Sequence, residues 1–159
     1  MKKIICISII GLFVTTSIFA QKNVIDEVFK KYSKIESATV VDINGFLLKI
    51  AAKHDEDFKN LNISDIKVLT IEDPEDNKGI NFYNEILPGL DLNVYKELIR
   101  ITDKDQKVVI LLKEKGTNIE EFLVVVGGSE NTLVRIKGNI NRDQFEEYAN
   151  LADVNIHVD

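Results

Sequence analysis

Cysteine is almost absent from this sequence. The one cysteine, Cys6, lies inside an apolar run near the N-terminus, and residues 21–159 contain no thiol. That part of the chain can form no disulfide and holds no cysteine nucleophile, even in a compartment that would allow disulfides. Packing and hydrogen bonds must stabilise it instead.

Histidine is scarce as well, since only His54 and His157 are present. His54 precedes three acidic residues and could bind a metal or act as a base beside a carboxylate, but such a charged run after a helix is typical of a solvated linker. His157 lies two residues from the C-terminus, where chains commonly fray. The sequence has neither a glycine-rich phosphate loop nor the H-E-x-x-H zinc motif. We therefore predict no catalytic, cofactor-binding or metal-binding residue.

An excess of basic charge is also missing. The chain has 20 basic and 26 acidic residues, and without Lys2 and Lys3 its net charge is about −8. This acidic balance excludes a nucleic-acid partner, which needs a basic surface to release counterions from phosphates. It also argues against adhesion to anionic lipid headgroups.

Two short segments carry residue types that occur in ligand sites. The acidic segment 72–77 could hold calcium, but its carboxylates do not fall at the alternating offsets of an EF-hand loop, which favours an ordinary acidic loop. Gly127, Gly128 and Ser129 could form an oxyanion nest, yet two glycines between two strands are typical of a hairpin turn.

The longest apolar run occupies the N-terminus. Lys2 and Lys3 precede the apolar region 4–13, and residues 17–20 form a plausible cleavage site that ends in the small residue Ala20. This order predicts a signal peptide over residues 1–20 that is cleaved near Ala20, so that the protein is periplasmic or secreted and keeps no stable membrane anchor. An uncleaved anchor is the alternative, but residues 4–20 are short for a membrane span.

The remaining residues, 21–159, fit a single domain with one core. Helical spacing of apolar residues alternates with β-rich runs and turn signals. The expected elements are a helix at about 23–33 with Asn23 as N-cap, a strand at 37–42, a short helix after Gly45, a strand at 63–71, helices at about 82–87 and 92–101, strands at 107–114, 121–126 and 131–137, and a helix capped by Asn141. We predict an α+β two-layer sandwich with about five strands in a mixed or antiparallel sheet, a C-terminal three-stranded meander, and helices mainly on one face.

The strands at 108–112 and 122–126 are apolar on both sides. A strand with one wet face alternates apolar and polar residues, so both faces of these strands are expected to be covered. Either helices cross to the second face, or one face is an apolar patch for a partner, a second copy of the chain or a lipid-like ligand. For that patch we chose Val109, Leu111, Leu123 and Val125, although either parity could face the helices.

Several stretches, taken together, resemble a known family. They are 65–70, 95–100, 107–116, 121–128 and 133–140. In their order and apolar texture they resemble the domain of unknown function 4252, found in small exported proteins of Gram-negative bacteria, and the resemblance spans about residues 24–151. It implies a signal peptide, one compact α+β domain and an envelope location, and it brings no established activity or catalytic residue. Relatives of this family tend to be encoded near sigma and anti-sigma factors of the extracytoplasmic type. The resemblance therefore also implies a link to envelope signalling.

Some relatives of that family carry a lipoprotein cysteine at the end of the signal segment, which this chain lacks. Arg100, Lys113, Arg135 and Lys137 fall inside the matching stretches, and we interpret them as strand-edge and surface charges that keep strands from pairing with other chains.

Three classes of function remain open from the sequence. We favour a non-catalytic binding or accessory protein of the envelope, whose partner is a protein or an apolar ligand. A periplasmic hydrolase that uses carboxylates near His54 is the enzymatic alternative. A homo-oligomeric structural protein, such as a homodimer, is the third.

Overall fold

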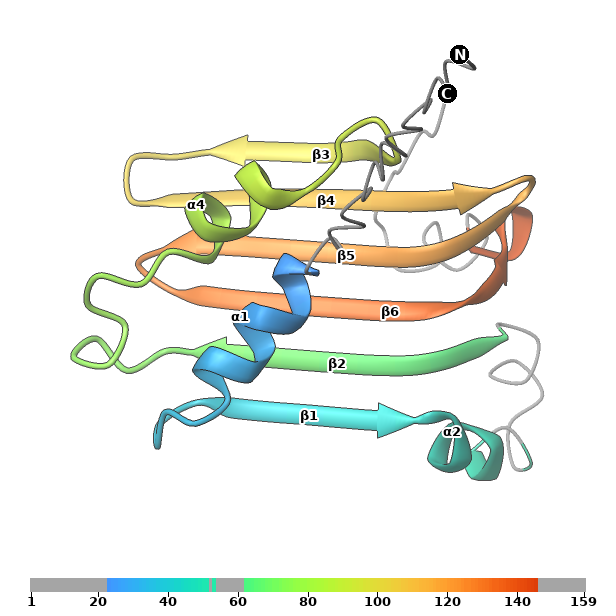
Figure 1. Cartoon of the computed structure of the whole chain (residues 1–159), viewed down its shortest axis with the longest axis horizontal. Helices are drawn as coiled ribbons and strands as arrows, with labels where there is room; N and C mark the ends of the chain where they lie inside the picture. The colour runs from blue at the N-terminus through green and yellow to red at the C-terminus, as the bar shows by residue number, and fades with distance from the viewer. Residues whose placement is uncertain (1–22, 52, 54–61, 146–159) are drawn as a thin grey trace, which may run out of the picture.

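The fold is built on one antiparallel sheet (Figure 1). A computed structural model describes residues 23–51, 53 and 62–145, and in them six strands pair in the order β1-β2-β6-β5-β4-β3. The strands are β1 (Thr39–Asn44), β2 (Ile63–Ile71), β3 (Tyr95–Thr102), β4 (Gln106–Lys115), β5 (Asn118–Gly128) and β6 (Asn131–Asn141); the helices are α1 (Val24–Tyr32), α2 (Gly45–Ala51), α4 (Phe82–Ile86) and the 3-10 turn η1 (Leu87–Gly89). The protein is thus α+β, as predicted, with one strand more than expected.

Both predicted helix caps are present. The Asn23 side chain accepts a hydrogen bond from the amide of Ile25 at 3.1 Å, which satisfies one of the free donors at the start of α1. Asn141 accepts from the amides of Asp143 and Gln144 at 2.9 and 3.3 Å, and residues 142–145 are helical. The rest of the predicted C-terminal helix lies outside the described residues.

The sixth strand is β3, where a helix had been predicted at 92–101. Tyr95, Leu98 and Ile99 are spaced as on a helix, but the register of β3 against β4 shifts between Glu97 and Ile99. A β-bulge of this kind inserts one extra residue and breaks the alternation that identifies a strand. The helical spacing of these apolar residues therefore arises from a bulged strand.

Helices α1 and α4 pack on one face of the sheet and form the main core with it (Figure 1). Helix α1 buries the stripe of Ile25, Val28, Phe29 and Tyr32, and the ring of Tyr32 lies 5.2 Å from that of Phe82 in α4. The sheet residues in this core have no exposed area: they are Leu69, Ile71, Val109, Leu111, Leu123, Val125 and Leu133. None of the described helices has the length and apolar character that a membrane crossing requires.

Two buried asparagines hold the loop between β2 and α4 against the β5–β6 hairpin. Asn77 donates to the carbonyls of Gly128 and Ser129 at 3.1 and 2.7 Å, and Asn131 accepts from the amide of Phe82 at 2.6 Å. Gly127 allows this close approach, because a Cβ there would lie 2.6 Å from the amide nitrogen of Tyr83. The predicted hairpin is present, but the two glycines are the last residues of β5 and not part of its turn, which Ser129 and Glu130 form.

The alternation along β5 predicts how neighbouring substitutions differ. Leu123→Ala should lower the free energy of unfolding by about 3 kcal/mol, because it leaves a cavity between the sheet and the helices. Val124→Ala, on the half-buried opposite side, should cost less than half as much. Urea unfolding of both variants measures the difference in the free energy of unfolding. Equal losses of stability would contradict the placement of Leu123 and Val124 on opposite faces of the sheet.

Candidate functional site

The sheet face opposite α1 and α4 carries three rows of side chains that run across all six strands. Residues paired directly across neighbouring strands point to the same face, so the strand register defines each row. The first row is Ile99–Ile110–Val124–Val134–Val68–Val41, the second is Lys96–Leu112–Phe122–Ile136–Ile66–Ile43, and the third is Ile101–Val108–Val126–Thr132–Thr70–Thr39. We call these three rows the open face.

The open face is apolar and incompletely covered. Only Lys96 in the three rows is charged, and it lies on the edge strand β3. Only Leu112 in them is fully buried, whereas Val41 is 38% and Ile101 54% exposed. Large apolar patches of this kind mark interaction surfaces on soluble proteins.

One corner of the open face is closed by the chain itself. Leu112, Ile119 and Ile140 are buried there in a second, smaller core. Phe145, in the helical turn after β6, packs against this core with its ring 5.5 Å from that of Phe122. The rows of Val134 and Thr132 lie farther from this corner along the strands.

The residues chosen from the sequence for a partner face lie on the wrong side of the sheet. Val109, Leu111, Leu123 and Val125 are fully buried under α1 and α4, so they belong to the core. The opposite parity of the same two strands faces outward. Of the two covers expected for the second face, helices or a partner, the described residues supply only the small one at the Phe145 corner and leave most of the open face partly exposed.

On the helix-covered face, charged residues follow the apolar core toward one end of the strands. The cross-strand row there is Tyr95–Lys113–Glu121–Lys137–Asp65–Asn44. Register shifts occur beside it on β2, β4 and β5. Bulges of this kind re-aim side chains and are common next to binding sites.

Arg135 is the centre of this charged region. Its side chain is only 4% exposed, and its guanidinium forms ion pairs with Asp26 of α1 at 2.6 Å and with Asp65 of β2 at 3.9 Å. The same guanidinium lies 5.4 Å from the centroid of the Phe29 ring. The interpretation of Arg135 as a strand-edge charge was therefore wrong: it lies on the central strand β6 and connects α1 to the sheet.

Glu121 is buried beside Tyr95 on the same face. Its Oε1 atom has no hydrogen-bond partner among the described residues. Burial raises the pKa of the Tyr95 hydroxyl well above its usual range, and the negative charge of Glu121 together with a hydrogen bond to it raises that pKa further. Tyr95 thus stays neutral at every physiological pH.

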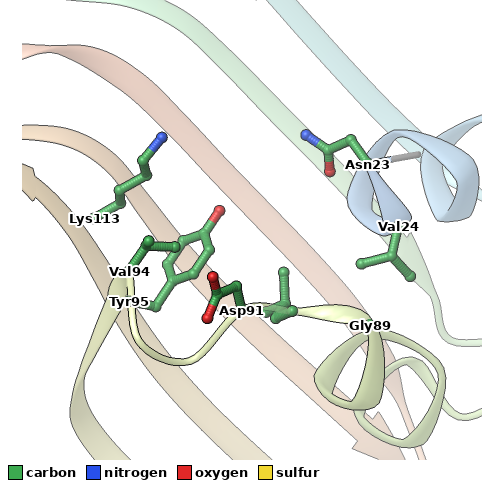
Figure 2. A pocket seen from close by; sticks show the side chains of 8 residues that line it. Asn23, Val24, Gly89, Asp91, Val94, Tyr95 and Lys113 are labelled. Atoms are coloured by element: carbon green, nitrogen blue, oxygen red, sulfur yellow. The ribbon is translucent and has the colours of Figure 1, made fainter. Parts of the chain in front are cut away.

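A hollow of about 170 Å³ lies beside Tyr95, and Figure 2 shows the side chains that line it. It is lined by Asn23, Val24, Gly89, Leu90, Asp91, Val94, Tyr95 and Lys113. Lys113 forms an ion pair with Glu120 at 3.4 Å. Hydroxyl, carboxylate and ammonium groups thus border the hollow without forming a nucleophile and base pair.

The other predicted charges occupy different positions. Arg100 is exposed on the edge strand β3 and pairs with Glu97, whereas Lys113 and Lys137 lie on the inner strands β4 and β6. In the acidic loop, Asp73 accepts hydrogen bonds from the amides of Glu75 and Asp76, as in an ordinary turn. His54 and His157 lie outside the described residues.

The chemistry available within the described part of the chain is limited. Residues 23–51, 53 and 62–145 contain no histidine and no cysteine. Nowhere in these ranges do three carboxylates gather closely enough to hold a metal ion.

Comparison with known proteins agrees with the resemblance noted in the sequence. Residues 32–148, more than half of the chain, match the family described as a domain of unknown function (DUF4252). The chain belongs to this family. The match extends from the end of α1 through all six strands, so the open face, Arg135 and Asp65 lie inside the matched segment, whereas Asp26 and Phe29 of α1 precede it. No curated protein and no solved structure matches the chain.

The raised pKa of Tyr95 predicts a stability loss in alkali. In the unfolded chain Tyr95 loses its proton above its ordinary value near pH 10, whereas in the folded chain it stays protonated. The unfolded state then binds fewer protons, so stability falls as the pH rises above about 10, by at most about 1.4 kcal/mol per pH unit. Tyr95→Phe should remove this part of the slope in urea unfolding at increasing pH; parallel slopes for the two proteins would contradict it.

Proposed function

We propose that this protein is a non-catalytic binding protein of the cell envelope that uses its open face to bind a protein partner. The proposal rests on the amino-acid composition of that face. Three rows across six strands hold a single charged residue and remain partly exposed. Apolar surface in contact with water raises the free energy of the protein, and a partner that covers this face lowers it again.

A protein fits this face better than a small molecule does. Ligand pockets are concave and enclose most of the ligand. The open face is formed by side chains of an extended sheet, and its central row consists of β-branched residues on every strand. Such side chains lose little rotamer freedom when they are buried, which favours a broad contact with another protein.

The envelope location rests on the sequence of residues 1–20, which lie outside the described structure. Their basic start, apolar centre and small residue at Ala20 support export and cleavage. The chain purified from the periplasm of its own host should begin at Gln21. Intact-mass measurement tests this, and a mass that includes residues 1–20 would contradict cleavage.

Photo-cross-linking in intact cells tests the open face directly. A photoreactive benzoylphenylalanine at Val134, in the middle of the open face, should give a cross-linked adduct of defined mass. The matched control places the same residue at Leu92, which is 51% exposed and lies before β3, outside the three rows. We expect an adduct at position 134 and none at position 92.

Two results would count against the proposal. One is the absence of an adduct at position 134 in cells in which the variant folds. The other is an equal yield of the same adducts at both positions, since that would indicate random encounters.

A further inference from the structure

The near absence of charged side chains from the open face bears on which kind of protein can bind there. Its first row is aliphatic on all six strands, and its third row combines Ile101, Val108 and Val126 with three threonines. The side chains therefore offer no charge pattern by which a different protein could be selected. Apolar contact and shape remain as the means of recognition.

A surface of this kind suits a second copy of itself. In a twofold-symmetric dimer the same patch meets itself, so every charge near the axis would approach its own copy. The open face avoids this repulsion, because Lys96 lies on the edge strand β3. The opposite face, on which α1 and α4 pack, carries the charged row of Lys113, Glu121 and Lys137, and the whole chain has a net charge of −6.

The uncovered part of the open face comes close to the size that a specific dimer needs. Three positions of the second row, Leu112, Phe122 and Ile136, already pack in the corner that Phe145 covers. The other fifteen positions, with strands about 4.8 Å apart and rows about 6.7 Å apart, give a footprint of roughly 480 Å² per chain. Two such faces together give roughly 960 Å², close to the roughly 1,000 Å² of buried surface that a specific interface requires. Sheets of two domains pack face to face about 10 Å apart when the facing side chains are apolar.

From this composition, charge placement and size, we infer that the open face is the interface of a homodimer in which two sheets pack against each other. This inference rests on the proposed function and names its partner as a second copy of this chain. The contact centres on the rows of Val134 and Thr132, because the Leu112 corner is already covered by Phe145. The α1 and α4 faces then point outward from the dimer.

Native mass spectrometry of the chain purified from its own host tests the inference. At about 10 µM the wild-type protein should have twice the mass of one chain. Val134→Asp should raise the dimer dissociation constant at least 100-fold, because each aspartate would be buried near the other in the interface. The control Leu92→Asp should leave this constant unchanged. A wild-type chain that stays monomeric at about 100 µM, or a folded Val134→Asp protein that stays dimeric, would overturn the inference.

A cysteine variant keeps the test valid if Val134→Asp does not fold. Since residues 21–159 contain no cysteine, Val134→Cys with Cys6→Ser has one thiol per chain, and any disulfide joins two chains. Oxidation should link the Val134→Cys protein into dimers and leave the corresponding Leu92→Cys protein monomeric. Equal linkage of both, or of neither, would overturn the inference.

The outcomes separate this inference from the proposed function. A photo-adduct at position 134 that contains a different protein, together with a monomeric wild type, would support the binding function and overturn the homodimer. A monomer that dimerises after deletion of residues 146–159 would also overturn it, because that segment would then be the occupant of the face. A missing adduct together with a monomer would overturn both.

Discussion

The antiparallel register of the six strands is the constraint on which the rest of the structure depends. Direct pairing across β1-β2-β6-β5-β4-β3 places each residue on one of two faces, and a shift by one residue would exchange them. In β5, Leu123 and Val125 form the core with α1 and α4, while Val124 points away from them. One register thus creates both the buried core and an apolar surface that the described helices leave partly exposed.

The helix-covered face combines two kinds of stabilisation along the same strands. At one end aliphatic side chains fill the space under α1 and α4, and at the other Arg135, Asp26 and Asp65 join the helix to the sheet through ion pairs. A charge buried as deeply as that of Arg135 is tolerated in a fold only when it is paired, since its desolvation is costly. The position of α1 across the strands is therefore fixed by packing at one end and by Arg135 at the other.

Most elements could be predicted from the sequence, because their signals are local. The cap at Asn23, the amphipathic stripe of α1 and the tight connection between β5 and β6 each depend on a few neighbouring residues. Strand β3 was mistaken for a helix because its bulge at residues 97–99 interrupts the alternation. The role of Arg135 was missed because its partners lie on α1 and β2, far away in the sequence.

By itself, the sequence determined the α+β class, the order of the elements apart from β3, the apolar character of both sides of the central strands and the family resemblance. Only the tertiary structure decided which side became the core. Val124 and Val125 are the same residue type in adjacent positions, so nothing local distinguishes them. Val125 is buried and Val124 is partly exposed because α1 and α4 cover only one face of the sheet. Which face the helices cover depends on contacts between segments that are distant along the chain.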